Sequence, residues 1–105
     1  MTDVRWTLEM RKMAVAFPNF EPFREGDRIC FIGALRGRNG QTFDIMIQAA
    51  ASRYPSQRPS IFISPRIGSN WLRDGSLCVT TPWSPERGTF AQQVAYAASY
   101  IAQHG

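Results

Sequence analysis

The segment GSLCVTTPWSPE, residues 75–86, contains the most nucleophilic kind of side chain in this sequence, the thiol of Cys78. The cysteine lies between a glycine and a Trp-Ser-Pro step, in a stretch without the apolar spacing of a helix or strand. Leu77 and Val79 can anchor such a segment on either side and leave the sulfur accessible. The alternative is that Cys78 is a small buried residue used for packing. The composition and context of the segment leave both readings open.

A histidine-activated hydrolase and a zinc site both fit this sequence poorly. His104, the only histidine, lies at the C-terminal end and would have to fold back over the loop to reach Cys78. Two cysteines and one histidine cannot complete a four-ligand zinc site, so we expect neither metal nor cofactor.

A thiol without a neighbouring base can still exchange acyl groups with a thioester, because reactant and product are close in energy. An ordinary cysteine, with a pKa of about 8.5, is a few per cent thiolate near neutral pH. The protein then has mainly to position the two partners and to stabilise a tetrahedral oxyanion.

Composition bounds the possible locations and partners. The 105 residues suffice for one domain, and no run approaches the roughly 18 apolar residues of a membrane span. The charged N-terminus lacks the apolar stretch of a signal peptide, so we expect a cytoplasmic protein that does not bind membranes. There Cys30 and Cys78 remain free thiols. The net charge of +4 comes from scattered arginines without a basic run, which argues against nucleic-acid binding.

Helical spacing occurs at both ends of the chain. Apolar residues at spacings of four, three and four predict a helix over residues 4–17, which Pro18 ends. Thr89 opens a second helix, with Gln92 three residues later as its partner in a capping box. The apolar faces are Trp6, Met10, Met13 and Phe17 in the first helix, and Phe90, Val94, Ala97, Ala98 and Ile101 in the second.

Three segments between the helices have the patterns of β-strands. Residues 28–35 form a nearly continuous apolar run, residues 41–48 alternate between apolar and polar, and residues 61–64 form a short third strand. The Asn39-Gly40 pair predicts a hairpin between the first two. The preceding residues, 18–27, are expected to be a turn-rich connector.

Residues 65–88 have no periodicity, and a loop of that length in a compact domain is usually functional or disordered. Large apolar side chains, Trp71 and Trp83 among them, need burial and therefore predict an ordered loop. The order of elements is helix, three-stranded meander, long loop and helix. It predicts an α+β domain with the helices on one side of an antiparallel sheet.

Short motifs follow one another in order along the second half of the chain. They are Tyr54-Pro55, Pro59, Ile61-Phe62-Ile63, Ser64-Pro65-Arg66, Gly75-Ser76-Leu77-Cys78 and Trp83-Ser84-Pro85. Taken in order, these segments resemble the ubiquitin-conjugating enzymes. In that family a Tyr-Pro…Pro segment leads into a strand, a His-Pro-Asn turn follows, and then come Gly-x-(Ile/Leu)-Cys and Trp-Ser-Pro.

The likeness covers nearly the whole chain as an ordered pattern and implies one domain, residues 1–105, with the fold of that family. Familiar members carry further C-terminal helices after the last helix here. A minimal domain of this kind suggests a divergent bacterial relative. Such relatives typically accompany an activating enzyme, a ubiquitin-like protein and a deconjugating protease.

The resemblance also implies an activity. Cys78 would accept the C-terminus of a ubiquitin-like protein as a thioester from an E1-like activating enzyme. It would then pass that acyl group to a target amine or another acceptor, with or without a ligase. In the family the first helix helps to dock the activating enzyme, and here Arg5, Glu9 and Lys12 would form its exposed face. Trp83 is expected to fix the shape of the cysteine loop.

The turn that precedes the cysteine departs from the family pattern. Ser64 and Arg66 stand where the histidine and the asparagine would be. The asparagine is assigned to oxyanion stabilisation or to shaping the loop, and loss of one oxyanion donor typically costs about 10²–10³ in rate. Asn70, in a segment longer than the pattern requires, is our first candidate to replace it, and Arg66 is the second.

The residues after the cysteine depart from the pattern as well. Thr80 and Thr81 stand where the family usually has an acidic residue. Asp74 or Glu86 is then left to orient or deprotonate an incoming amine. Both also fit the role of an ordinary surface carboxylate.

Two other functions stay open. One is a non-catalytic module on the same scaffold that binds a ubiquitin-like protein or a partner enzyme, which the missing histidine and asparagine favour. The other is an unrelated α+β adaptor in which Cys78 is packed. Accessibility of the Cys78 sulfur, with a groove beside it for an extended tail, distinguishes the enzyme from the adaptor.

Overall fold

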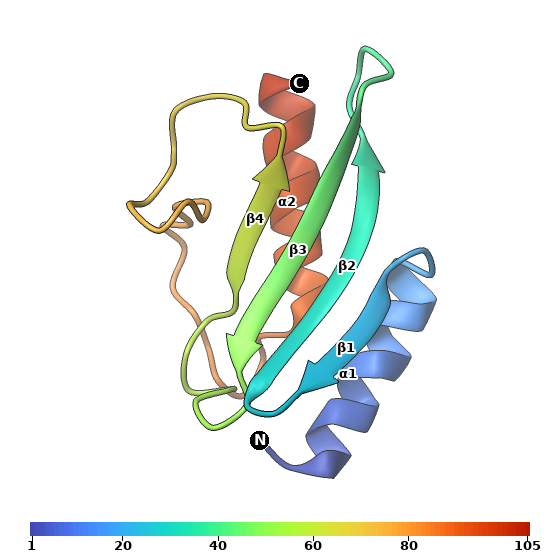
Figure 1. The fold of residues 1–105 in the computed structure, drawn as a ribbon, viewed down its shortest axis with the longest axis vertical. Coiled ribbons are helices and arrows are strands. Elements are labelled where there is room, and N and C mark those ends of the chain that lie inside the picture. The colour runs from blue at the N-terminus through green and yellow to red at the C-terminus, as the bar shows by residue number, and fades with distance from the viewer.

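The computed structural model describes all 105 residues as two helices and one four-stranded antiparallel sheet. The strands lie in the order β1-β2-β3-β4, and both helices cover the same face (Figure 1). The predicted α+β architecture is therefore confirmed at this level. The elements are α1 (Asp3–Ala16), β1 (Glu21–Glu25), β2 (Arg28–Arg36), β3 (Thr42–Ala50), β4 (Ser60–Ser64) and α2 (Phe90–His104).

The central hairpin forms as its sequence pattern predicts. β2 and β3 pair along their whole length, from Arg28 opposite Ala50 to Arg36 opposite Thr42. The connecting turn contains Gly40 with φ +85°, a left-handed conformation that favours glycine. The alternation in β3 also holds, because Phe43, Ile45 and Ile47 are each at most 1% exposed.

The sheet has one strand more than the three predicted. β1 lies inside residues 18–27, which we expected to be only a connector, and it pairs with β2 from Glu21 opposite Ile32 to Glu25 opposite Arg28. All five of its residues are exposed, so no alternation marks it as a strand. Backbone pairing with β2 stabilises it, and its charges and Pro22 suit an edge strand.

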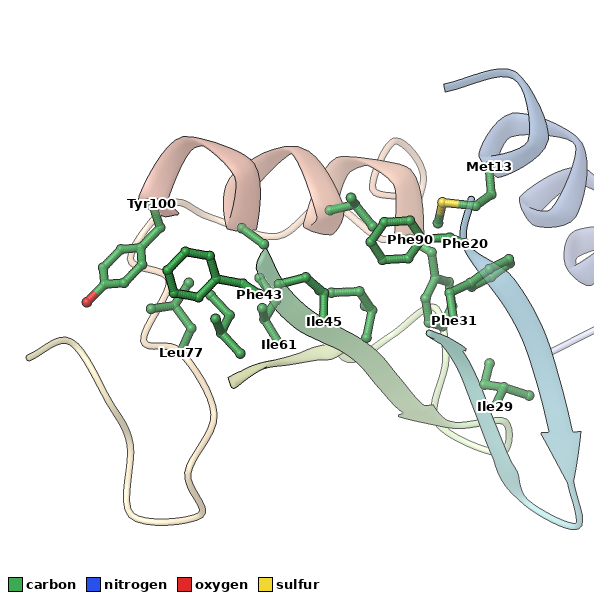
Figure 2. Packing of buried hydrophobic residues seen from close by; sticks show 14 of the residues in the cluster. Met13, Phe20, Ile29, Phe31, Phe43, Ile45, Ile61, Leu77, Phe90 and Tyr100 are labelled. Carbon is green, nitrogen blue, oxygen red and sulfur yellow. The ribbon is translucent and has the colours of Figure 1, made fainter. Parts of the chain in front are cut away.

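The hydrophobic core fills the space between α2 and the sheet (Figure 2). From α2 the residues Phe90, Val94, Ala97 and Ile101 are at most 1% exposed, whereas Ala98 is half-buried. Thr89 caps the helix as predicted, since its hydroxyl accepts the Gln92 N–H at 3.0 Å. The face of α1 is less deeply buried than predicted. Trp6 and Met13 enter the core, but Met10 and Phe17 only border it.

Glu9 corrects the prediction for the outer face of α1. It is 1% exposed, and its carboxylate accepts hydrogen bonds from the Arg5 side chain (2.8 Å), the Phe90 backbone N–H (3.0 Å) and the Tyr54 hydroxyl. Arg5 also turns inward and donates to the Gly88 carbonyl at 2.6 Å. The expectation that Glu9 lies on an exposed face is therefore wrong, and of the three residues only Lys12 is fully exposed.

The hydrogen bonds that meet at Glu9 form a buried junction, and burial affects the ionisation of its tyrosine. Burial, together with the hydrogen bond to Glu9, raises the pKa of the Tyr54 phenol, so it stays a neutral donor.

Neither helix of the structure is both long and apolar enough to cross a membrane.

We predict that Glu9→Ala lowers the free energy of unfolding by about 3 kcal/mol. The change removes the acceptor of the Phe90 N–H and the Tyr54 hydroxyl, and each buried group left unpaired costs about 1–3 kcal/mol. Urea denaturation followed by tryptophan fluorescence measures the difference. Lys12→Ala, on the exposed side of the same helix, should change stability by less than about 0.5 kcal/mol. Equal stabilities of the two variants would contradict the role given to Glu9.

Candidate functional site

The long loop between β4 and α2 contains no helix or strand, and a short antiparallel bridge organises its middle. Trp71 and Leu77 form the bridge, and the Leu72 N–H donates to the Ser76 carbonyl at 2.8 Å. Leu77 is buried, and its N–H donates to the carbonyl of Ile61 in the edge strand β4 at 2.8 Å. Figure 2 places Leu77 at the end of the core near Tyr100. The prediction of an ordered loop is confirmed.

Cys78 lies next to this anchor, and its side chain is exposed. Its backbone is nevertheless held, because the Cys78 N–H donates to the Asn70 carbonyl at 2.7 Å. A buried packing role for Cys78 is thereby excluded. In contrast, Cys30 on β2 is buried, and this desolvation raises the pKa of its thiol. The two thiols therefore differ in their access to reagents.

Asn70 and Cys78 face each other across the bridge. Residues directly opposed in an antiparallel pair project from the same face, with Cβ atoms about 4.5–5.5 Å apart. The Trp71 and Leu77 pair is adjacent, so its side chains project from the opposite face, toward the core. Both Asn70 and Cys78 are exposed, and the pairing of their backbones favours the same side of the bridge for the two side chains.

A shallow groove of about 230 Å³ adjoins Cys78, between the segment that follows the cysteine and α2. No charged residue lines it. Its hydroxyl and amide groups can bond to the backbone of an extended chain, which suits a tail with small, uncharged side chains. The lining residues are Leu77, Cys78, Val79, Thr80, Thr81, Tyr96, Ser99, Tyr100 and Gln103.

Four contacts hold the groove in place: they involve the Arg58 side chain and the Pro55 carbonyl before β4, the Trp83 ring in the loop and the Tyr100 ring in α2. Arg58 donates to the Val79 carbonyl at 2.8 Å and to the Thr81 carbonyl. The Trp83 indole N–H donates to the Pro55 carbonyl at 2.7 Å and so connects the loop to the segment before β4. On the other side of the loop, the Tyr100 hydroxyl donates to the Ile67 carbonyl at 2.7 Å.

Arg66 does not lie at the groove. Its guanidinium sits 5.7 Å from the Trp71 ring centre, and the residue lines a separate cavity of about 420 Å³ over the uncovered face of the sheet. Ser64, the residue in the position of the family's histidine, lines the same cavity. This placement gives Arg66 no direct access to a group attached to Cys78.

Asp74 closes the turn at the far end of the bridge from Cys78. Its carboxylate accepts from the Ser76 N–H at 2.9 Å and from the Ser76 hydroxyl at 2.6 Å, and both bonds hold the pKa of Asp74 below its ordinary value. Gly75 completes the turn with φ +90°. Neither Asp74 nor the exposed Glu86 lines the groove. The geometry favours a structural role for Asp74.

Several residues of the site have little or no signal in the sequence. Tyr96, Ser99 and Gln103, at spacings of three and four, form a polar face of α2, and this spacing alone could have identified them. Arg58 has no such signal, because its two carbonyl partners lie 21 and 23 positions further along the chain.

Comparisons of the chain with protein-family models, with curated proteins and with solved structures find no match. The assignment of a function therefore depends on the geometry of the site.

We predict that the Ser76 amide titrates with Asp74 at a pH below the ordinary aspartate pKa of 3.8. Because the folded-state pKa is depressed, the stabilisation of the turn is present above about pH 4 and is lost as the pH falls through the lower folded value. NMR spectroscopy of the Ser76 amide against pH measures the midpoint. Asp74→Asn retains an acceptor oxygen and should abolish this titration. A midpoint at or above the ordinary value would refute the assignment.

Proposed function

We propose that the protein is an acyl carrier of the ubiquitin-conjugating type. Cys78 would accept a ubiquitin-like protein as a thioester from an E1-like activating enzyme and transfer it to an acceptor. The observation that carries the proposal is an exposed cysteine with a fixed backbone, at the edge of a groove that can hold an extended tail. The order of helix, meander, loop and helix is compatible with the fold of that family.

The loading step is an exchange between two thioesters. The Cys78 thiolate attacks the carbonyl carbon of the incoming thioester, and a carbon–sulfur bond forms while the carbonyl oxygen takes up the negative charge. The intermediate collapses, the bond to the donor sulfur breaks, and the donor leaves as a thiolate. No histidine or carboxylate lines the groove. The reaction needs no such base, because one thiolate replaces another.

Asn70 is the side chain best placed to stabilise the oxyanion. Asn70 does not line the groove, but its backbone is bonded to that of Cys78, and from there its amide can donate to an oxygen attached near the sulfur. The structure offers Arg66 no comparable position. Transfer of the acyl group to an amine requires a larger rearrangement of charge than the thiol exchange. The contribution of Asn70 should therefore be larger in discharge.

Docking of the activating enzyme would involve the outer face of α1. Lys12 is exposed there, whereas Glu9 is buried and cannot take part. The exposed apolar residues Val4, Leu8 and Val15 extend this face. A target protein or a ligase would approach the open side of the groove, and the acceptor is an amine or a hydroxyl.

A second candidate is a non-catalytic module that binds a ubiquitin-like protein in the same groove. The replacement of the family's histidine and asparagine by Ser64 and Arg66 favours it. It predicts a stable complex without a covalent bond to Cys78.

We predict a thiol-labile adduct when the protein is mixed with an E1-like enzyme, ATP and a ubiquitin-like modifier. On a gel run without reductant, the adduct should migrate as a new band that disappears with added thiol. The band should be absent from Cys78→Ala and present in Cys30→Ala, since Cys30 is buried. A non-covalent complex in place of the band would support the second candidate. A folded protein whose Cys78 does not react even with iodoacetamide would exclude the acyl-carrier function.

We predict that Asn70→Ala slows discharge to a free amine by about 10²-fold and slows loading less, because the amide acts mainly in the transition state of transfer. Single-turnover assays of the preformed thioester measure discharge. Ser69→Ala is the matched control, since Ser69 is an exposed polar residue next to Asn70 whose backbone is not bonded to Cys78. Identical discharge rates for Asn70→Ala and the parent would remove Asn70 from the mechanism.

A further inference from the structure

Arg58 donates two hydrogen bonds to the backbone that follows Cys78. One guanidinium nitrogen donates to the Val79 carbonyl at 2.8 Å, and the second donates to the Thr81 carbonyl. The guanidinium also lies 5.8 Å from the ring centre of Trp83. A single side chain thus fixes the directions of two carbonyl groups, both within three residues of the reactive sulfur.

These two hydrogen bonds from Arg58 determine where the N–H group of Thr80 points. The Val79–Thr80 peptide is trans, because the chain has cis bonds only before Pro55 and Pro65. In a trans peptide the carbonyl and the N–H point in opposite directions. With the Val79 carbonyl turned toward Arg58, the Thr80 N–H points away from it. Thr80 lines the groove beside Cys78, and its N–H donates to no acceptor within the protein.

The arrangement is maintained at a cost. The third nitrogen of the guanidinium, Arg58 Nε, is buried and has no hydrogen-bond partner. A buried donor left unpaired is unfavourable, and a flexible side chain on the surface would ordinarily turn to satisfy it. Arg58 instead keeps the orientation that holds the two carbonyls.

We propose that the Thr80 N–H is an oxyanion donor in acyl transfer at Cys78 and that Arg58 is the positioning residue that aims it. The proposal rests on the acyl-carrier function proposed above and adds a backbone donor to the Asn70 amide. When the thiolate attacks the thioester carbonyl, the oxygen that gains the electron pair is held by this N–H. The N–H returns to solvent when the donor thiolate leaves. Neither the Thr80 N–H nor the Arg58 guanidinium gains or loses a proton in the step.

A backbone donor can be removed without changing any side chain. Cys78 permits assembly of the full 105-residue chain by chemical ligation of residues 1–77 to a synthetic peptide of residues 78–105. Replacing the Val79–Thr80 amide with an ester deletes the Thr80 N–H. The matched control is an ester between Thr80 and Thr81, because in an extended segment alternate N–H groups point to opposite sides. The Thr81 N–H therefore faces the Arg58 side.

The assay compares two reactions of the same thiol. The first is acylation by a synthetic tetrapeptide thioester of small uncharged residues ending in glycine, and the second is alkylation by iodoacetamide. Acylation passes through an oxyanion and alkylation does not, so their ratio isolates oxyanion stabilisation from access and nucleophilicity. Intact mass spectrometry measures both rates, and peptide mapping confirms reaction at Cys78 rather than Cys30.

We predict that the ester at Thr80 lowers the acylation rate by about 10²-fold and leaves alkylation unchanged. The ester at Thr81 should change neither rate. Acylation at the parent rate, or an equal fall in both reactions, would overturn the proposal for Thr80. A parent chain that iodoacetamide alkylates but the thioester never acylates would overturn the acyl-carrier function itself, and this proposal with it.

The ratio of acylation to alkylation rates also tests the positioning role of Arg58. Arg58→Met and Arg58→Lys should each lower acylation relative to alkylation, since methionine has no donor and lysine lacks the planar fork that fixes the directions of both carbonyls. Added methylguanidinium should restore part of the acylation rate in Arg58→Met. Circular dichroism and thermal melting establish that the variants are folded. A fall that affects acylation and alkylation alike, without rescue, would reduce Arg58 to a structural residue.

Discussion

The carboxylate of Glu9 is the contact on which the arrangement of the domain depends. It is buried and accepts hydrogen bonds from three parts of the chain: α1 itself, the segment before β4, and the first residue of α2. A buried carboxylate is tolerated only when it is paired and hydrogen-bonded, so these three parts must come together in one geometry. Arg5 extends the junction to the Gly88 carbonyl, at the end of the long loop. The start of α2, and with it one wall of the groove, is thereby fixed.

The long loop has no regular structure of its own, and its order is supplied from outside. Leu77 is bonded to β4, Arg58 and the Pro55 carbonyl hold the segment after Cys78 through its carbonyls and Trp83, and Tyr100 of α2 holds Ile67. These tethers all act on the backbone or on a bulky ring. The side chain of Cys78 itself is left free. The loop therefore combines a fixed main chain with an accessible sulfur, as group transfer requires.

The sequence predicts the elements that are specified by local periodicity and misses the contacts between distant residues. The alternation of β3 and the capped helix α2 follow from nearest-neighbour patterns. β1 has no burial pattern, because it is held by pairing with β2, and its prediction required knowledge of that partner. Glu9 looked like a surface residue, since its spacing from Arg5 is that of a solvent-exposed ion pair. Its other partners lie 45 and 81 positions away. The loop position of Cys78 and the candidacy of Asn70 came from the sequence, whereas the bridge that pairs their backbones is created by the fold.

The chemical character of the groove would affect the lifetime of the proposed thioester as well as its formation. Hydrolysis would need a base to activate water, and neither histidine nor carboxylate lines the groove. Asp74, the nearest acidic residue in sequence, is engaged with Ser76 at the far end of the bridge. Exchange between thiols proceeds without such a base, because the attacking and leaving groups are alike. An environment of this kind favours exchange with an incoming thiol over loss of the acyl group to water. Donors aimed at the oxyanion accelerate hydrolysis as well as thiol exchange, so the proposed selectivity comes from the missing base rather than from Asn70 or Thr80.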